Sequence, residues 1–256
     1  MCLILLVWRV HPRYRCIIAA NRDEFHQREA APARWWPDKP HILAGRDLAG
    51  GGTWLGLTRS GRFAALTNFR GAGPQRPEAP SRGALVTAML ERDGTMDEDL
   101  RHLEQVGGDY NAFNLLVSDG RRLGVYETER RVARELGPGI YAVSNHLLDT
   151  PWPKVQKAKS RLREALADPD DTGALLDMLR DDVPAPDEQL PRSGLGIEWD
   201  RMLSSAFVRS ADYGTRCSTI VRVAHDGTAQ FDEWCWDRAG AQTAVTRLRF
   251  AVPEWH

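Results

Sequence analysis

The sequence predicts an α+β fold, with strands at both ends of the chain and helices in its middle. Near the start, apolar residues form strand-like runs at residues 2–10 and 16–20. In the middle, apolar residues recur at helical spacing, as in residues 82–91. Near the end, two strand-like runs flank an Asp-Gly pair at residues 226–227, which is a hairpin signal. Separate blocks of strands and helices are typical of α+β layering rather than of alternating βαβ units.

The first hairpin is expected to place an aspartate beside Cys2. The two N-terminal apolar runs flank a turn that contains Pro12, and proline suits a turn. If the turn centres on Pro12 and Arg13, the strands pair symmetrically and residue 2 faces Asp23.

A second hairpin is expected after three consecutive glycines at residues 50–52. Residues 54–58 and 63–67 form its strands, and a Ser-Gly turn joins them. The return strand ends next to Asn68, which is therefore expected at the edge of a sheet.

The remaining elements follow from the same patterns. Helices are expected at residues 82–91, 96–106, 153–166 and 172–179, the third with proline in its first turn. Strands are expected at residues 113–118, 122–126, 140–144, 217–223, 230–236 and 247–252. The strand at 140–144 ends next to Asn145. A loop rich in Pro, Asp and Gly is expected over residues 181–196.

Composition narrows the class of protein. The chain has 256 residues, 42% of them hydrophobic, which suits one domain over residues 1–256 with a substantial core. The net charge of −1 argues against a nucleic-acid-binding module. The longest apolar run, at residues 2–8, is too short to span a bilayer and lacks the flanks of a secretory signal. The protein is therefore expected to be soluble and cytoplasmic.

No metal or resident cofactor is expected. The four cysteines form no C-x-x-C pair, and the histidines show no ligand spacing such as H-E-x-x-H. Without a secretory signal, free thiols are the better interpretation of the four cysteines.

Cys2 is the most informative position for chemistry. Methionine aminopeptidases remove Met1 when the second residue is small, which would leave Cys2 with a free α-amine. An α-amine has a pKa of about 7.7–8.0 and can act as a base near neutral pH. A nucleophile and its base would then belong to one residue. The alternative is that a cysteine follows Met1 by chance.

Other polar residues each have a catalytic and a structural interpretation. Asp23 belongs to an Asn-Arg-Asp-Glu run that either orients the Cys2 thiol or closes a hairpin. Asn68 and Asn145 either serve a cleft or cap their strands. Arg216 could instead pair with a nearby carboxylate such as Asp212.

Two further features are candidates for ligand contact. Trp35 and Trp36 lie in a Pro-flanked segment, which we expect to be a loop that lines a ligand-binding mouth. His146 follows Asn145 and is either a residue that contacts a ligand, including a metal or haem, or a satisfied polar residue.

Taken together, these segments resemble the NRDE family, also called the transport-and-Golgi-organisation-2 family. Met-Cys at the start and Asn-Arg-Asp-Glu at residues 21–24 form the signature that gives this family its name. Further family-like blocks follow in order at residues 49–56, 66–70, 113–116, 143–146, 149–154 and 213–219. Cys217 departs from the pattern, since a small residue such as Ser is expected there.

The resemblance implies an N-terminal-nucleophile hydrolase fold, a four-layer α-β-β-α sandwich. The family is more distantly similar to cysteine amidases such as penicillin V acylase and bile salt hydrolase. Those enzymes combine an N-terminal Cys with an Asp, two Asn residues and an Arg. The matching positions here are Cys2, Asp23, Asn68, Asn145 and Arg216.

One motif departs from the amidase pattern. The amidases carry an Arg-Asn-x-Asp run, whereas here Arg22 occupies the x position. The residues expected to contact substrate are Asn21, Arg22, Trp35, Trp36 and His146.

Two classes of function therefore compete. The first is an amidase or thioesterase that acts on a small, non-peptide substrate through Cys2. The second is a carrier, because family members are linked to haem trafficking and to lipid or acyl-CoA homeostasis, and function does not follow from fold. A third is an interaction protein with a dead site. The state of residue 2 discriminates them, because only the enzyme needs a free α-amine.

Overall fold

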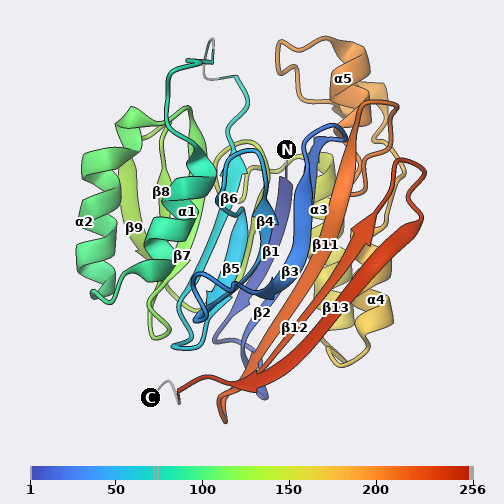
Figure 1. Ribbon diagram of the computed structural model, residues 1–256. Helices are drawn as coiled ribbons and strands as arrows, with labels where there is room; N and C mark the ends of the chain where they lie inside the picture. Colours follow the sequence, from blue (N-terminus) through green and yellow to red (C-terminus); the bar gives the residue numbers. More distant parts are fainter. Residues whose placement is uncertain (1, 72, 74, 254–256) are drawn as a thin grey trace.

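The protein is built from two antiparallel sheets that pack face to face, each covered by helices on its outer side (Figure 1). The computed structural model describes residues 2–71, 73 and 75–253. Helices α1 (Arg82–Glu91) and α2 (Met96–Val106) cover one sheet, and α3 (Pro153–Ala165) and α4 (Thr172–Leu179) cover the other. The fold is therefore the expected four-layer α-β-β-α sandwich.

The six-stranded sheet carries the start of the chain in its interior. Its strand order is β10 (Gly139–Val143), β1 (Cys2–Trp8), β2 (Tyr14–Phe25), β11 (Tyr213–Ala224), β12 (Thr228–Trp236) and β13 (Gln242–Ala251). Every residue of β1 is buried, because the strand has a sheet neighbour on each side and a packed layer on each face. This explains why its sequence is a continuous apolar run rather than an alternating one.

The seven-stranded sheet follows the chain order. Its strands are β3 (Ala30–Trp35), β4 (Ile42–Asp47), β5 (Leu55–Thr58), β6 (Phe63–Asn68), β7 (Phe113–Ser118), β8 (Leu123–Glu127) and β9 (Val132–Leu136). Neighbouring strands pair antiparallel throughout. Most are joined by short connections, whereas the segment between β6 and β7 carries α1 and α2.

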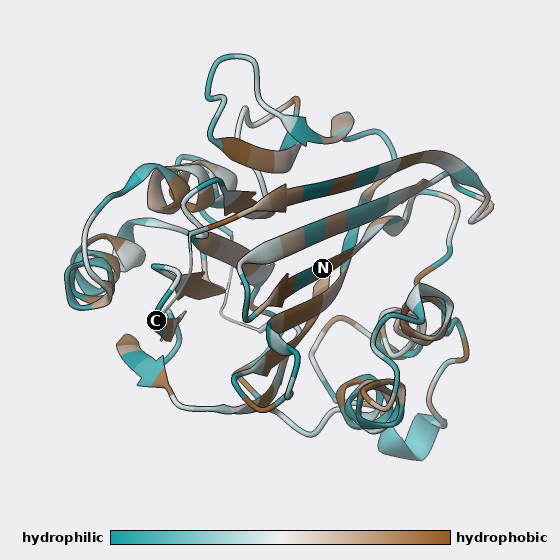
Figure 2. Ribbon diagram, turned by 90° about the horizontal axis from the view of Figure 1, so that it is seen from below, coloured by the Kyte–Doolittle hydropathy of each residue, from teal (hydrophilic) through white to brown (hydrophobic). Residues whose placement is uncertain are grey.

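Alternating side chains of β1 divide the core into layers. Ile4 and Leu6 point toward the seven-stranded sheet, whereas Leu3 and Leu5 point toward α3 and α4. A third apolar cluster joins the seven-stranded sheet to α1 and α2. Figure 2 shows the result, with mostly hydrophobic central strands and helices that alternate between hydrophobic and hydrophilic faces.

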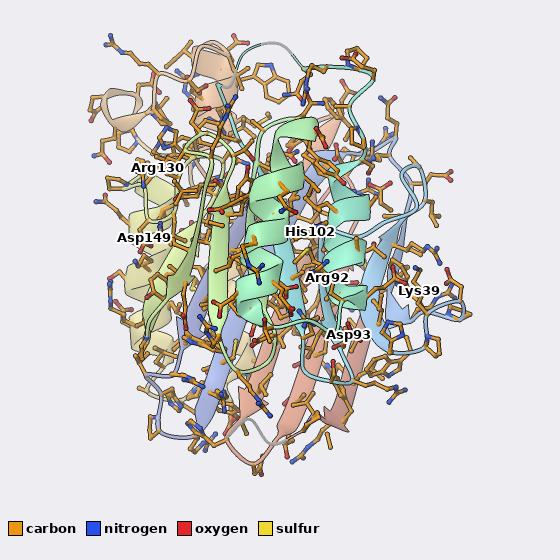
Figure 3. The ribbon with its side chains drawn as sticks, turned by 90° about the vertical axis from the view of Figure 1, so that its left-hand side faces the viewer. Lys39, Arg92, Asp93, His102, Arg130 and Asp149 are labelled. Atoms are coloured by element: carbon orange, nitrogen blue, oxygen red, sulfur yellow. The ribbon has the colours of Figure 1, made fainter. Side chains whose placement is uncertain are left out.

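Local signals explain where the helices begin. The Thr95 hydroxyl caps α2, and the Glu98 carboxylate accepts a hydrogen bond from the backbone N–H of Thr95 in return. Pro153 occupies the first turn of α3, where its missing N–H costs no hydrogen bond. Figure 3 looks onto the outer layer of α1 and α2, where Arg92 and His102 lie on the surface of the sandwich.

The first hairpin differs from its predicted register by one residue. Cys2 pairs with Arg22, not with Asp23, so the hairpin is centred on Pro12. The turn holds an odd number of residues, because the Arg9 N–H donates to the Arg15 carbonyl (2.8 Å) with Arg9 at a φ of 53°. A slip of one residue exchanges the two faces of a strand. The side chain of Arg22 therefore shares a face with Cys2, and that of Asp23 points toward the helices.

Several elements were not predicted from the sequence. Strands β3, β4 and β9 and the short helix α5 (Ile197–Met202) all lie in segments without a clear apolar period. Strands β3 and β9 are the two edges of their sheet and are mostly exposed or half-buried. Within the described parts of the chain, no helix is both long and apolar enough to cross a membrane.

Candidate active site

Cys2 opens onto a cavity of about 390 Å³ at one end of the sandwich. The thiol is 7% exposed and lies at the first residue of β1. The cavity is also lined by Asp23, Asn68 and Arg82, which come from β2, β6 and the first residue of α1. Segments far apart in the sequence therefore meet around one sulfur atom.

The environment of Cys2 keeps its thiol protonated. Burial raises the pKa of the thiol, and this effect outweighs the backbone hydrogen bond from Asp23 and the charge of Arg22, which both favour the thiolate. Since the thiolate is the reactive form, a nucleophilic Cys2 needs a base within reach.

Asp23 lies beside Cys2 on the helix-facing side of β2. Its side chain is buried, and its Oδ1 accepts a hydrogen bond from the Thr215 hydroxyl (2.7 Å). The Tyr213 hydroxyl donates to its backbone carbonyl (2.9 Å). Burial raises the pKa of the Asp23 carboxyl, and the ammonium of Lys154 acts against that rise. The Thr215 hydrogen bond thus fixes the carboxyl in place, and a neighbouring cation such as Lys154 favours its ionised form.

Asn68 and Asn145 are brought together, but only Asn68 lines the cavity. Asn145 is fully buried, and its Nδ2 donates to the backbone carbonyl of Asn68 (2.9 Å). Next to it, the Ser144 hydroxyl donates to the Cys2 carbonyl (2.9 Å). Residues 144 and 145 thus connect the start of β1 to the end of β6.

Arg216 lies apart from the Cys2 cavity. It is the extra residue of a β-bulge in β11, where Thr215 pairs with Asp23 and Cys217 pairs with Arg22. Its Nη1 donates to three backbone carbonyls of residues 25–28, at 2.9, 3.2 and 3.0 Å. Its side chain lines a second cavity of about 140 Å³. The structure therefore shows Arg216 holding the turn that follows the Asn-Arg-Asp-Glu run.

Two of the expected substrate-contacting residues belong to that run. Arg22 lines both cavities and pairs with Asp47 (Nη2 to Oδ2, 3.0 Å). Asn21 points the other way, and its Nδ2 donates to the carbonyls of Leu179 (2.7 Å) and Ala206 (2.8 Å). Asn21 therefore ties β2 to the helical layer.

The two tryptophans do not line the Cys2 cavity, and the expected loop is wrong for Trp35, which ends β3. Trp35 packs edge-on against Phe250 at 4.9 Å between ring centroids. Trp36 is 1% exposed, and its indole N–H donates to the Ala44 carbonyl (3.0 Å). Both side chains are placed by packing against the hydrophobic core, Trp35 at its margin and Trp36 within it.

His146 is packed between two aromatic rings rather than placed in the cavity. Its ring centroid lies 5.0 Å from that of Phe69 and 5.7 Å from that of Trp152. Its Nδ1 shares a hydrogen bond with the Thr150 hydroxyl (2.9 Å). Burial lowers the pKa of His146, which favours the neutral ring.

The sequence interpretation did not single out Arg82, which lines the Cys2 cavity at the start of α1. Its Nη1 donates to the Ala112 carbonyl (3.1 Å). Burial lowers the pKa of its guanidinium, and the charges of Glu24 and Cys2 act against that fall. The available signal was the Gly-Gly-Gly run at 50–52. A Cβ on Gly52 would lie 2.3 Å from the backbone of Gly83, so only glycine lets α1 begin this close to the cavity.

No metal site is evident among the described residues, where His, Cys, Asp and Glu side chains form no group of three or more suited to a metal ion.

A four-layer sandwich with a cysteine at the start of a central strand has the fold of the N-terminal-nucleophile hydrolases. A solved structure of this class is the C2A mutant of conjugated bile acid hydrolase from Clostridium perfringens. It superposes with a TM-score of 0.55 and 8% sequence identity, covering 97% of this chain and 92% of that one. At this identity, the likeness shows the fold alone.

The chain belongs to the Transport and Golgi organisation 2 family, whose pattern it matches over residues 1–238. It is 37% identical to the human Transport and Golgi organization protein 2 homolog over 260 residues, covering 91% of this chain and 92% of the human protein. The Drosophila melanogaster Transport and Golgi organization protein 2 is 27% identical over 261 residues, with 91% of each chain covered.

Proposed function

We propose that this protein is a cysteine N-terminal-nucleophile hydrolase that cleaves an amide or thioester bond of a small, non-peptide substrate. The observation that carries the proposal is the position of Cys2, whose thiol lines a cavity with Asp23 and Asn68 at the first residue of a buried strand. The cavity volume of about 390 Å³ fits a small molecule.

Nucleophilic attack would begin with the α-amine of Cys2, exposed once Met1 is removed. The neutral amine takes the thiol proton, and the thiolate attacks the substrate carbonyl. The resulting ammonium returns a proton to the leaving amine or thiol as the tetrahedral intermediate collapses to a thioester. Water then attacks the thioester with the amine again as base, and the acid product leaves.

The oxyanion of the tetrahedral intermediate needs a hydrogen-bond donor. Asn68 is the better candidate for this role, because it lines the cavity whereas the Nδ2 of Asn145 is engaged by the Asn68 carbonyl. One such donor is worth about 2.7–4 kcal/mol of barrier. Asn145 would position Asn68 across the gap between the two sheets.

Charge balance in the site is the proposed role of Asp23. Its buried carboxyl would ionise beside the α-ammonium that forms during attack, because an adjacent cation offsets the cost of its burial. Arg216 would act indirectly, because it holds the backbone of residues 25–28, which begins two residues after Asp23. Arg22 and Arg82 provide positive charge along the cavity wall.

The proposal is tested by turnover of an acyl 4-nitroanilide and an acyl thioester, with protein that carries no N-terminal tag. Cys2→Ala should lose about a thousandfold or more of kcat, because removal of a nucleophile removes the covalent path. Cys235→Ser is the matched control, since this thiol lies in the neighbouring cavity. Turnover that survives Cys2→Ala, or that fails equally in Cys235→Ser, would refute the assignment.

A further inference from the structure

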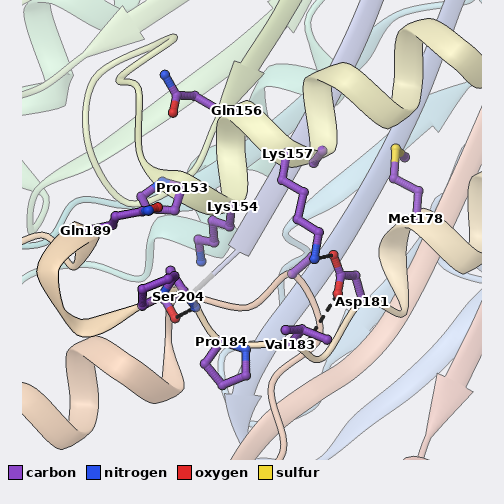
Figure 4. Close-up of a pocket in the computed structure, with 14 residues that line it drawn as sticks. Pro153, Lys154, Gln156, Lys157, Met178, Asp181, Val183, Pro184, Gln189 and Ser204 are labelled. Carbon is purple, nitrogen blue, oxygen red and sulfur yellow. Dashed lines mark hydrogen bonds and ion pairs between the residues drawn. The ribbon is translucent and has the colours of Figure 1, made fainter.

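A third cavity, of about 470 Å³, lies on the helical side of the six-stranded sheet, between α3, α4 and residues 183–206 (Figure 4). Its walls combine an apolar part with a polar part. The apolar lining residues are Pro153, Ala158, Met178, Val183, Pro184, Ala185, Pro186 and Ala206. Neither Cys2 nor any other residue that lines the Cys2 cavity lines this one.

One cation in this cavity lacks a partner. Lys154, in the first turn of α3, is 4% exposed, and its Nζ forms no hydrogen bond within the described part of the chain. Figure 4 shows its side chain running from α3 toward the segment that carries Ser204. A buried ammonium without a hydrogen-bonding partner is costly, so such a group is an unusual feature for a merely structural position.

Three of the polar groups that line the cavity are already engaged. The Lys157 ammonium pairs with the Asp181 carboxylate (2.5 Å). The Ser204 hydroxyl donates to the Arg201 carbonyl (2.6 Å) and accepts from the Ala185 N–H (2.8 Å). Lys154 is thus a buried cation of the lining whose Nζ has no hydrogen-bond partner among the described residues.

We propose that this cavity is a binding site for a small monocarboxylate with an apolar body, whose carboxylate pairs with the Lys154 ammonium. The apolar part of the walls accepts the body of such a molecule, and the single unpaired cation selects one negative charge. The lining residues differ from those of the Cys2 cavity, although the Lys154 ammonium also acts on the buried carboxyl of Asp23. Binding at this cavity does not require a reactive Cys2.

The charge on Lys154 sets the pH range of binding. Burial lowers the pKa of Lys154 to about 8, while Asp23 and Cys2 act to raise it and Arg70 acts to lower it. The other charged groups of the cavity, Lys157 and Asp181, are paired with each other. Lys154 is therefore mostly protonated at neutral pH, and carboxylate affinity should fall as the pH rises above about 8.

The test is calorimetric titration of the full chain with hexanoate and with its neutral analogue hexanamide at pH 7. Hexanoate should bind, and Lys154→Met should weaken it about tenfold or more, as should the loss of charge in hexanamide. Lys157→Met is the matched control on the same helix and should bind hexanoate nearly as the parent does. Cys2→Ala should also bind normally, which separates this site from the proposed hydrolase.

A second variant tests the site independently, in case Lys154→Met does not fold. Ala185→Phe places a large ring in the cavity while leaving Lys154 intact, and it should also abolish hexanoate binding. The proposal is overturned if hexanoate does not bind, or if hexanamide binds equally well. It is also overturned if Arg82→Met rather than Lys154→Met removes binding, because the carboxylate would then occupy the Cys2 cavity.

Discussion

Asn145 is the residue that links the two sheets beneath the Cys2 cavity. Its Nδ2 donates to the Asn68 carbonyl, and its own carbonyl accepts from the Arg70 N–H (2.7 Å). It lies after β10 in one sheet, whereas both partners lie at the end of β6 in the other. We therefore expect its amide side chain to hold the backbone of Asn68 in place.

Asn145→Ala is expected to destabilise the protein by about 1–3 kcal/mol, because it leaves a buried carbonyl without its donor. It should also lower kcat more than it raises KM, because it displaces Asn68. Urea unfolding and steady-state kinetics measure the two effects. Asn111→Ala is the control for stability only, because Asn111 makes its hydrogen bonds to the Arg76 backbone near the surface but also lines the Cys2 cavity. Equal unfolding free energies for the two variants would contradict the role given to Asn145.

Glu233 is a second residue whose burial has a measurable consequence. It is 2% exposed, and its Oε1 accepts from the Ala33 N–H (2.6 Å) between the two sheets. Burial raises its pKa above the ordinary value of 4.5. The folded protein therefore binds this proton more tightly than the unfolded chain does, so stability falls as the pH rises from about 4.5 through the raised folded value.

Glu233→Gln should flatten this part of the stability profile, because Gln keeps the acceptor oxygen but does not ionise. The measurement is the free energy of unfolding in urea between about pH 4.5 and pH 8. Glu188→Gln on the exposed surface is the control. If the difference between the parent and Glu233→Gln does not change with pH, the raised pKa is wrong.

At the scale of elements, the approach of α1 to the Gly-rich turn determines the shape of the Cys2 cavity. Gly52→Ala is expected to push the start of α1 outward, because the new Cβ would meet the Gly83 backbone at 2.3 Å. Overpacking of this kind costs about 1–3 kcal/mol, and the displaced Arg82 should also lower activity. Thermal unfolding and turnover report these effects. Gly108→Ala has open space around it and should change neither, and a neutral Gly52→Ala would refute the contact.

How far the sequence predicts an element depends on how its apolar residues are spaced. Helices α1, α2 and α4 begin and end at the predicted residues, because each buries one face against a sheet. The edge strands β3 and β9 were missed, because edge positions bury too little to impose an apolar pattern. The register of the first hairpin depends on a positive φ at Arg9. A positive φ is uncommon at a residue other than glycine, so the sequence does not predict it.

The candidate site shows the same limit at the scale of the whole molecule. Cys2, Asp23 and Asn68 were expected to meet and do so, because each lies at the end of a strand that reaches the same cavity. Arg216 was expected with them, but a bulge in β11 turns its side chain toward residues 25–28. Lys154 was not singled out, because a lysine in an amphipathic helix normally indicates a solvated face.

The fold places the start of β1 at the cavity of the proposed hydrolase. Strand β1 lies between β10 and β2, and residue 2 lines the cavity. The proposed hydrolase therefore depends on a free α-amine at Cys2, which a retained Met1 or an N-terminal tag would acylate. Intact mass of untagged protein measures whether Met1 has been removed.

Protein that has lost Met1 should show kcat/KM that falls as the pH drops below about 8, because protonation of the α-amine removes the base. Protein that retains Met1 or carries a non-cleavable N-terminal tag should be inactive but fold normally, as judged by circular dichroism and thermal unfolding. Cys2→Ser that has lost Met1 should keep the same pH dependence at a lower rate, since it retains the amine with a weaker nucleophile. Equal turnover by tagged and untagged protein would remove the α-amine from the mechanism and leave Cys2 without a base.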